Sequence, residues 1–385
     1  MDLDFLSPVE SVVLAHNQIL PLQSIGKNIA IHTEKDGVPD LKGVKIAIAG
    51  INENRNATQR TNHDKCLRNI RVELYKLFLG NWNHKIADLG NILKGETVED
   101  SYFAVKELVS KLQAQNILLI LIGGSQDITY PAYRGFDQSG QMVNIVSVDS
   151  GFDFGSADEL ISSSSYMSKI IIEKPNNLFN FCNLGYQTYY NAQEEIDLME
   201  KLFFDAYRLG SLINDITLAE PVLRDADLVS LDMTSLQCQE IASKDHMAPN
   251  GFNSREICTI ARYAGISDRV SFFGIFEGKE TPMAVQLTAQ IIWYFIEGVN
   301  YRKNDYPNPE LKNFDKYMVP IDNDELHFYK SHSSGRWWIE IPIIPNLNNK
   351  LKRHALLPCT HQDYLDACNQ VIPERWWKAY KKTMI

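Results

Sequence analysis

Short runs of apolar residues alternate along this chain with longer segments in which apolar positions recur every three or four residues. The apolar runs predict buried β-strands at residues 44–49, 117–122, 143–148 and 228–232. The periodic segments predict amphipathic helices at residues 64–79, 97–112, 253–265 and 281–298. Continuous apolar strands that alternate with such helices are typical of a parallel sheet covered on both faces. The pattern therefore predicts an α/β fold with a mainly parallel central sheet.

The pattern changes near residue 301, and it divides the chain into three parts. We expect an N-terminal arm at residues 1–40, an α/β domain at residues 41–300 and a C-terminal extension at residues 301–385. The extension holds four of the six tryptophans, in Arg-Trp-Trp sequences at residues 336–338 and 375–377. Trp and Arg are enriched at binding hot spots, but large aromatic side chains are usually buried. The extension is therefore expected either to pack on the core or to bind a protein partner.

Composition narrows the classes of function. The chain has 385 residues and a net charge of −10, which argues against general binding to nucleic acid or to anionic membranes. No apolar run approaches the roughly 18 residues of a membrane-spanning helix, so membrane insertion is not expected. The six cysteines show no paired spacing and the acidic start of the chain is no signal peptide. These features predict free thiols and a cytoplasmic protein.

Acidic side chains follow two of the predicted strands. Asp149 and Asp153 come after the strand at residues 143–148, and Asp232 ends the strand at residues 228–232. In α/β sheets the ligand crevice lies beyond the carboxyl ends of the strands, so these side chains are expected in one crevice. Carboxylate oxygens suit Mn²⁺, Mg²⁺ and Ca²⁺. The three aspartates are therefore candidate metal ligands.

Four segments match one set of known motifs in order and spacing. Residues 123–131, GGSQDITYP, resemble G-G-D-H-S-x-T-Y-P, and residues 148–153, VDSGFD, resemble V-D-A-H-x-D. Residues 230–238, SLDMTSLQC, resemble S-x-D-x-D-x-x-D-P, and residues 248–256, APNGFNSRE, resemble P-G-G-x-x-x-R-E. These motifs identify a resemblance to the ureohydrolase family of arginase, agmatinase and formimidoylglutamase. The resemblance covers about residues 40 to 300 and implies a three-layer αβα sandwich.

The resemblance implies a hydrolase with two manganese ions, which lower the pKa of a bound water so that hydroxide can attack a guanidinium or formimidoyl carbon. Carried over to this chain, one ion is assigned to Asp149, Asp153 and Asp232 together with Gln126. Gln126 stands where the family has a histidine, and its amide oxygen keeps an all-oxygen ligand set. This set could hold one divalent cation.

The second ion loses more of its ligands. Gly151 stands where the family has a histidine, and Thr234 stands where it has an aspartate, so that only Asp149 and Asp232 remain. Changes to outer-shell partners alone reduce metal affinity by roughly 10 to 100-fold. We therefore expect no cofactor, or at most one weakly bound Mn²⁺, Mg²⁺ or Ca²⁺. A cluster of hydrogen-bonded carboxylates without metal is the alternative to a single ion.

Glu277 matches the acidic residue that closes the substrate pocket in the resemblance, where it would face the cationic head of a ligand. A loop carboxylate bonded to local amides is the alternative. The three lost ligands predict a pseudoenzyme that acts as a scaffold, a regulatory subunit or a ligand-binding module. The surviving acids leave open a metal-dependent hydrolase of a guanidino or formimidoyl carbon–nitrogen bond. The resemblance also implies a homo-oligomer.

Overall fold

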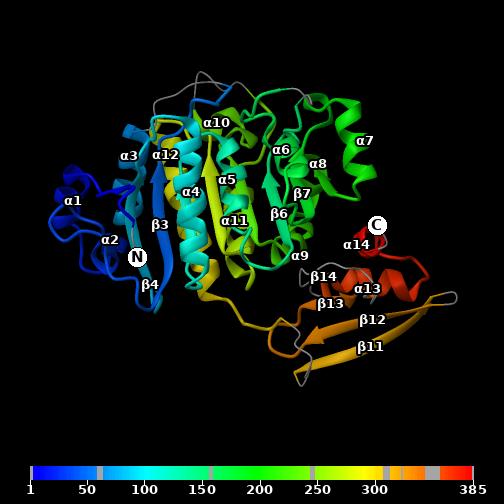
Figure 1. The fold of residues 1–385 in the computed structure, drawn as a ribbon. Helices are drawn as coiled ribbons and strands as arrows, with labels where there is room; N and C mark the ends of the chain where they lie inside the picture. Colours follow the sequence, from blue (N-terminus) through cyan, green and yellow to red (C-terminus); the bar gives the residue numbers. More distant parts are fainter. Residues whose placement is uncertain are drawn as a thin grey trace.

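The computed structural model describes residues 3–58, 64–155, 159–242, 248–306, 313–321, 324–342 and 356–383. Strands in these residues form one large sheet and one small sheet, and Figure 1 shows the small sheet beside one end of the large one. Among the helices in these ranges, none is long and apolar enough to cross a membrane.

The large sheet runs in the order β1-β4-β3-β5-β10-β9-β6-β7-β8, and β2 also pairs with β4. Its central strands are β3 (Val44–Ile51), β4 (Lys85–Ile92), β5 (Leu118–Ile122), β6 (Val143–Val148), β7 (Leu178–Tyr186), β8 (Asp205–Arg208), β9 (Leu228–Asp232) and β10 (Phe272–Phe276). All neighbouring pairs among these eight strands are parallel. The short strand β2 (Ala30–Ile31) is also parallel to β4, whereas β1 (Leu6–Ser7) is antiparallel to it. The predicted mainly parallel sheet is confirmed.

Helices cover both faces of this sheet, so the domain is a three-layer αβα sandwich (Figure 1). Successive side chains of β3 point to opposite faces of the sheet, as they do along any strand, and therefore pack against different helix layers. Ile46 and Ile48 pack in one apolar core and Ala47 and Ala49 in the other. The first core lies under α1 (Ser11–Gln18), α2 (Ile25–Asn28), α3 (Asp64–Lys76), α8 (Leu209–Asn214), α9 (Ala219–Arg224), α10 (Cys238–Ile241), α11 (Ser254–Ile266) and α12 (Pro282–Asn300). The second lies under α4 (Val98–Gln113), α5 (Thr129–Arg134), α6 (Tyr166–Ile172) and α7 (Gln193–Lys201).

Side-chain caps set the starts of three predicted helices. Thr97 accepts a hydrogen bond from the backbone of Asp100 at the start of α4, and Asn253 does the same for Glu256 in α11. In both helices the acidic side chain bonds back to the cap, which completes a capping box. Thr281 caps α12, with proline in its first turn. These three helices are confirmed, while the helix predicted at residues 64–79 ends earlier, at Lys76.

The C-terminal extension forms a second, antiparallel sheet. Its strands are β11 (Phe314–Ile321), β12 (Asp324–Ser331), β13 (Trp337–Glu340) and β14 (Leu356–Cys359), followed by α13 (His361–Cys368) and α14 (Glu374–Lys382). Trp337, Trp338 and Trp376 are buried, whereas Trp377 is 42% exposed. Arg224 of α9 donates hydrogen bonds of 3.0 Å to the carbonyls of Trp337 and Cys359. The extension is thus tied to the large domain, and the boundaries at residues 40 and 300 stay predictions.

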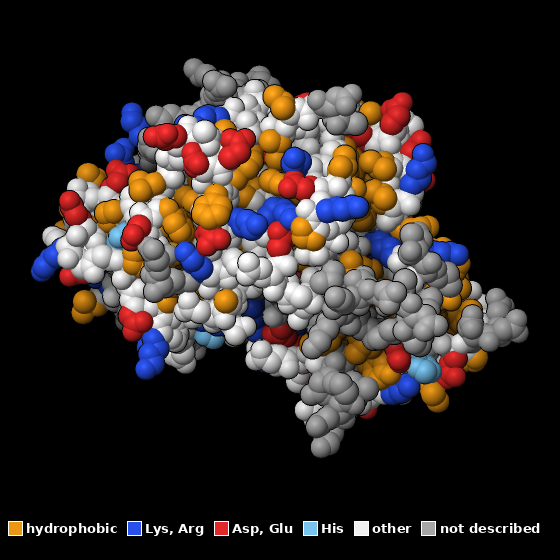
Figure 2. All heavy atoms as spheres, viewed as in Figure 1, with side chains coloured by type: hydrophobic (Ala, Val, Ile, Leu, Met, Phe, Trp, Pro, Cys, Tyr) orange, Lys and Arg blue, Asp and Glu red, His pale blue; other side chains and the backbone are white. Residues whose placement is uncertain are grey.

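The face of the molecule in Figure 2 carries both signs of charge. Lys and Arg side chains gather near its centre among hydrophobic and acidic side chains. A shallow pocket between α4, α5 and α6 is lined by Lys106, Arg134 and Lys169 together with Glu99 and Glu173. Ion pairs of 2.8 to 3.7 Å join these lysine and arginine side chains to neighbouring carboxylates. Lys106, Arg134 and Lys169 are therefore each paired with an acidic side chain.

Candidate functional site

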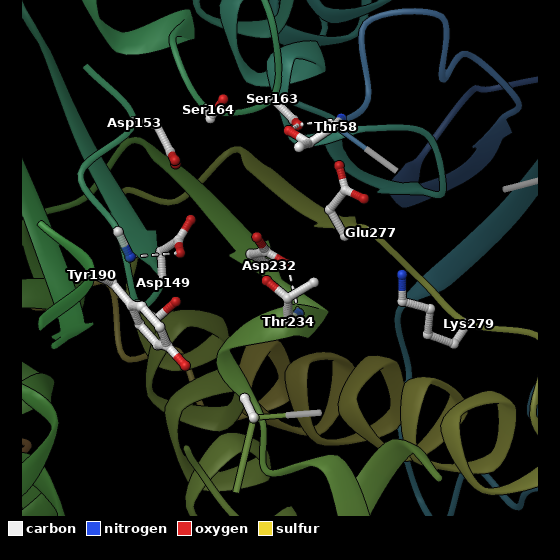
Figure 3. Close-up of a pocket in the computed structure, with 13 residues that line it drawn as sticks. Thr58, Asp149, Asp153, Ser163, Ser164, Tyr190, Asp232, Thr234, Glu277 and Lys279 are labelled. Atoms are coloured by element: carbon white, nitrogen blue, oxygen red, sulfur yellow. Dashed lines mark hydrogen bonds between the residues drawn. The ribbon is translucent and has the colours of Figure 1, made fainter. Parts of the chain in front are cut away.

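A cavity of about 520 Å³ lies beyond the carboxyl ends of β6, β9 and β10. Parallel strands end at the same edge of a sheet, and their loops therefore meet there. Figure 3 shows Asp149, Asp153, Asp232 and Glu277 directed into this cavity. The lining residues are Thr58, Asp149, Ser150, Gly151, Asp153, Ser163, Ser164, Tyr190, Asp232, Thr234, Ala248, Glu277 and Lys279.

Asp149 and Asp153 each keep one carboxylate oxygen without a hydrogen bond from the described residues. Oδ1 of Asp149 accepts a 3.0 Å bond from the Gly151 amide, but Oδ2 of Asp149 and Oδ2 of Asp153 accept none. Loss of contact with bulk water raises the pKa of Asp149, although the Gly151 amide opposes this rise. Burial also raises the pKa of Asp153 well above its ordinary value, and the charge of Asp149 adds to the effect. Two unpartnered acidic oxygens in one cavity suit a cation.

Asp232 is held at the end of β9 by its own chain. Its Oδ1 accepts a 2.6 Å hydrogen bond from the backbone amide of Thr234, so this carboxylate forms a cap for the turn that follows. Burial raises the pKa of Asp232 well above the ordinary range, and the charges of Asp149 and Glu277 raise it further. Asp232 therefore shares one electrostatic environment with the other acids of the cavity.

Glu277 follows β10 and has a left-handed backbone, with φ of 55°. Asp153 adopts the same unusual conformation, also with φ of 55°. Non-glycine residues rarely adopt it, and such strain tends to persist where a side chain must point in one direction. Oε1 of Glu277 accepts a 3.2 Å bond from the backbone amide of Gln126, and burial raises the pKa of Glu277 to about 7. Both acids are thus directed into the cavity by their backbones.

Gln126 is buried and is not among the residues that line the cavity. Its side-chain nitrogen donates to the Ser147 hydroxyl at 3.1 Å and to the Tyr166 hydroxyl at 3.3 Å. The side chain of Gln126 also lowers the pKa of Asp149, against the effect of burial. In this position Gln126 supports Asp149, and its role as a metal ligand stays a prediction.

Gly151 and Thr234 both line the cavity, next to the carboxylates. A Cβ built on Gly151 would come within 3.5 Å of Oδ1 of Asp153 and 4.0 Å of Oδ1 of Asp149. These are ordinary van der Waals distances, so the backbone leaves room for a side chain aimed at both acids. The glycine leaves that space without any ligand group.

Lys279 and Tyr190 are among the lining residues that were not singled out in the sequence. Lys279 lies two residues beyond Glu277 and is 5% exposed, and Tyr190 lines the opposite side of the cavity beside Asp149 (Figure 3). Lys279 follows a buried strand and lies two residues after Glu277, and this position is a weak sequence signal that it enters the cavity. Tyr190 lies in a 3₁₀ turn far from any motif, and nothing in the sequence marked it.

The cavity offers oxygen ligands for a metal ion. As placed, no three His, Cys, Asp or Glu side chains of the described residues come close enough together to form a complete metal-binding group. The unpartnered oxygens of Asp149 and Asp153, with Asp232 beside them, nevertheless fit a hard cation such as Mn²⁺, which accepts all-oxygen coordination. The oxygen donors of these three aspartates are therefore of the kind that manganese accepts, and their role as its ligands stays a prediction. Gly151 and Thr234 supply less.

Comparison with protein families gives a match over most of the α/β domain, because a model of the arginase family aligns with residues 44–286. The chain belongs to the arginase family. Among curated proteins, no sequence matches it. The resemblance seen in the four motifs is thereby confirmed.

Solved structures of arginase-family proteins share the fold at low identity. Formiminoglutamase from Trypanosoma cruzi, solved with Mn²⁺, has a TM-score of 0.63 at 17% identity, covering 73% of this chain and 99% of its own. Formimidoylglutamase from Bacillus subtilis has a TM-score of 0.61 at 15% identity, covering 69% and 90%. Agmatine ureohydrolase from Thermoplasma volcanium has a TM-score of 0.58 at 17% identity, covering 75% and 98%.

These findings correct the prediction about cofactors. The expectation of no cofactor, or at most one weakly bound Mn²⁺, Mg²⁺ or Ca²⁺, is wrong, because arginase-family relatives were solved with Mn²⁺ and point to a di-manganese cofactor. The expectation rested on counting the ligands lost at Gln126, Gly151 and Thr234. Such a count gives too little weight to the acids that remain. Four carboxylates line the cavity, and their charge attracts cations even where individual ligands are missing.

Proposed function

We propose that this arginase-family protein is a pseudoenzyme that keeps the family's ligand pocket, has lost its hydrolysis, and acts as a regulatory, scaffolding or ligand-binding module. The observation that carries the proposal is the contrast within one cavity. Asp149, Asp153, Asp232 and Glu277 are all directed into it, whereas Gly151 brings no ligand group to the space beside the first two acids. Attack by a metal-bound hydroxide requires tightly fixed geometry, whereas binding tolerates a looser site.

Manganese has a defined place in this proposal. Asp149, Asp153 and Asp232 are the residues that would hold it. Burial raises the pKa values of all three carboxyls, and a bound cation would favour their charged forms. When bound, the metal supplies positive charge to a ligand and lowers the pKa of a bound water. Gln126 supports Asp149 from below, and the Thr234 amide holds Asp232 in place.

The ligand in this proposal is a small molecule with a cationic nitrogen group. The cavity of about 520 Å³ suits a molecule of amino-acid size, and Glu277 places a buried carboxylate at its edge. One oxygen of Glu277 is occupied by the Gln126 amide, so the other can accept a hydrogen bond from a guanidinium, amidinium or ammonium group. Binding energy then comes from charge and shape, without a chemical step.

Three measurements on one preparation test the proposal. Manganese content is determined by elemental analysis, binding of arginine and agmatine by calorimetry, and release of urea or ammonia from arginine, agmatine and formimidoylglutamate by enzymatic assay. We expect binding together with hydrolysis at least about a hundredfold slower than that of T. cruzi formiminoglutamase assayed in parallel. Asp149→Asn should weaken manganese retention, and Glu194→Gln, at an exposed helix position, should not. Hydrolysis at rates comparable with the relative would contradict the proposal.

A second candidate is an active metal-dependent hydrolase of a guanidino or formimidoyl carbon–nitrogen bond. It is favoured by the left-handed backbones of Asp153 and Glu277, since strain of this kind is kept mainly where it serves a function. This candidate requires product release that depends on manganese and disappears in Asp149→Asn. Release that is unaffected by that substitution would come from a contaminant, and the candidate would then fail.

Three expectations from the sequence are also part of this proposal. We propose that the protein forms a homo-oligomer, is located in the cytoplasm and does not bind nucleic acid. A protein partner is proposed for the C-terminal extension, where Trp377 is the tryptophan that stays substantially exposed and Lys381 lies over its ring, 4.3 Å from the ring centre.

A further inference from the structure

The surface helix α12 carries very little charge. At the chain average of 22%, a helix of 19 residues would have about four charged side chains, but α12 has only Glu297. That carboxylate is already paired, because the Arg262 guanidinium lies 2.8 Å from it. The outer side of α12 therefore presents no unpaired charge to the solvent.

The exposed residues of α12 form one stripe along the helix. One side of α12 packs against α3 and α11, in the layer that Figure 1 shows behind the sheet. The exposed residues include Met283, Gln286, Gln290 and Tyr294. They are three or four positions apart and therefore lie on one face. Met283 is 51% exposed and Tyr294 is 37% exposed, so this neutral stripe, which we call the α12 face, is open on its outer side.

Aromatic side chains extend the α12 face toward α3. The Trp293 indole donates a 2.8 Å hydrogen bond to the carbonyl of Phe78, and its ring centre lies 5.0 Å from that of Trp82 and 5.3 Å from that of Tyr294. The Phe78 side chain is 51% exposed. Aromatic residues and methionine are enriched in the centre of protein interfaces, and charged residues are depleted there. The composition of this surface is therefore that of an interface.

We propose that the α12 face binds the same face of a second copy of this chain. Each copy carries a net charge of −10, so two copies repel one another unless uncharged surfaces meet. The α12 face meets this condition in both copies at once. The inference does not depend on the proposed ligand binding, and it gives the proposed homo-oligomer a defined surface.

A two-fold axis at Gln290 makes the contact self-complementary. With the two helices antiparallel, Gln290 lies opposite Gln290 of the partner subunit. The side-chain amide has both donors and acceptors, so the two copies of this residue can bond to each other. Gln286 and Tyr294 are each four residues from Gln290. Gln286 therefore lies opposite Tyr294 of the partner subunit, where an amide can bond to a phenol hydroxyl.

The length of α12 suits an interface between two copies. A helix of 19 residues is about 28 Å long. An interface that buries about 800 Å² on each partner is roughly 30 Å across. The stripe thus spans such an interface in one direction, and the aromatic side chains of Phe78, Trp82 and Trp293 widen it in the other.

The test measures the particle mass of the full chain by light scattering after size-exclusion chromatography, over a range of concentrations. We expect a mass of two copies, or of a larger even number. Gln290→Glu and Gln290→Lys each place two like charges across the axis, so each should halve the mass and raise the dissociation constant at least about tenfold. An equimolar mixture of the two variants should restore the original mass, because opposite charges then meet.

Gln193→Glu is the matched control, since it makes the same change at an exposed position of α7, which covers the other face of the sheet. It should leave the mass unchanged. A mass of one copy, or of an odd number of copies, for the unmodified protein would overturn the inference and leave the proposed ligand binding standing. Charged variants that associate like the control would overturn the role of the α12 face. Variants that dissociate but do not recover on mixing would overturn the two-fold contact at Gln290.

A second measurement decides if a charged variant does not fold. Gln290→Cys should be joined to a second copy by a disulfide under mild oxidation, since position 290 meets itself across the axis. Gln193→Cys should not be joined in this way. Equal cross-linking of the two cysteine variants would overturn the proposed contact.

Discussion

At the scale of single residues, the site combines acids that are well positioned with positions that lack a ligand. Asp153 and Glu277 have strained backbones that point their side chains into the cavity, and Asp232 is fixed by the Thr234 amide. Gly151 and Thr234 contribute little to a metal, although both lie where a ligand would reach it. In the proposed pseudoenzyme the change is therefore local, because the cavity and its four acids remain.

This persistence predicts that ligands can be put back. A Cβ at position 151 would meet the carboxylates of Asp149 and Asp153 at ordinary contact distances, so Gly151→His combined with Thr234→Asp should place two ligands in existing space. We expect manganese affinity to rise by roughly tenfold or more, measured by metal titration in a calorimeter. Gly151→Ala, which adds the Cβ but no ligand, is the control and should show no gain. Unchanged affinity in the double variant would mean that the backbone has moved from the family's geometry.

Glu277 gives a second prediction at this scale, for pH. Its pKa is raised from 4.5 to about 7, so the folded state holds a proton that the unfolded chain releases, and stability falls as pH rises from about 4.5 through 7. Glu277→Gln removes this effect. In metal-free buffer at pH 8, the melting temperature of the Glu277→Gln variant should exceed that of the unmodified protein by several degrees. At this pH, keeping the buried Glu277 carboxyl ionised costs the folded protein on the order of 3 kcal/mol. The gap should close as pH falls toward 5; a gap that does not change with pH would contradict the assignment.

At the scale of elements, α9 connects the two sheets. Its last residue, Arg224, is buried, donates to the carbonyls of Trp337 in β13 and Cys359 in β14, and lies 4.6 Å from the ring centre of Trp338. Burial lowers the pKa of this guanidinium, which shows that its contacts are made away from water. One side chain from the α/β domain therefore satisfies backbone groups on two strands of the extension.

Arg224→Ala should loosen this connection. Two buried carbonyls lose their donors, so we expect a loss of about 2 to 4 kcal/mol in the free energy of unfolding. Denaturant unfolding followed by tryptophan fluorescence is the measurement, because Trp337 and Trp338 lie at the affected contact. Arg255→Ala, at an exposed position of α11, is the control and should change stability by less than about 0.5 kcal/mol. Equal stability of the two variants would show that the extension is held mainly by its apolar contacts.

At the scale of the whole molecule, parallel topology explains why one cavity gathers residues from distant parts of the chain. Strands β6, β9 and β10 are neighbours in the sheet although many residues separate them in the sequence. Their carboxyl ends meet at one edge, so Asp149, Asp232 and Glu277 converge without any local sequence relation. The same arrangement brings Lys279 into the acidic cavity.

The sequence alone determined the α/β architecture, because buried strands and amphipathic helices leave periodic patterns that do not depend on the rest of the fold. It also placed Asp149, Asp153 and Asp232, since polar residues that follow apolar strands lie at the sheet edge, and the family resemblance placed Glu277. The tertiary structure alone decided that Gln126 turns toward Ser147 and Tyr166, that Lys279 and Tyr190 enter the cavity, and that Arg224 holds the second sheet. Those facts depend on which side chains from remote segments come into contact, and pairwise contacts of that kind leave no periodic signal in a single sequence.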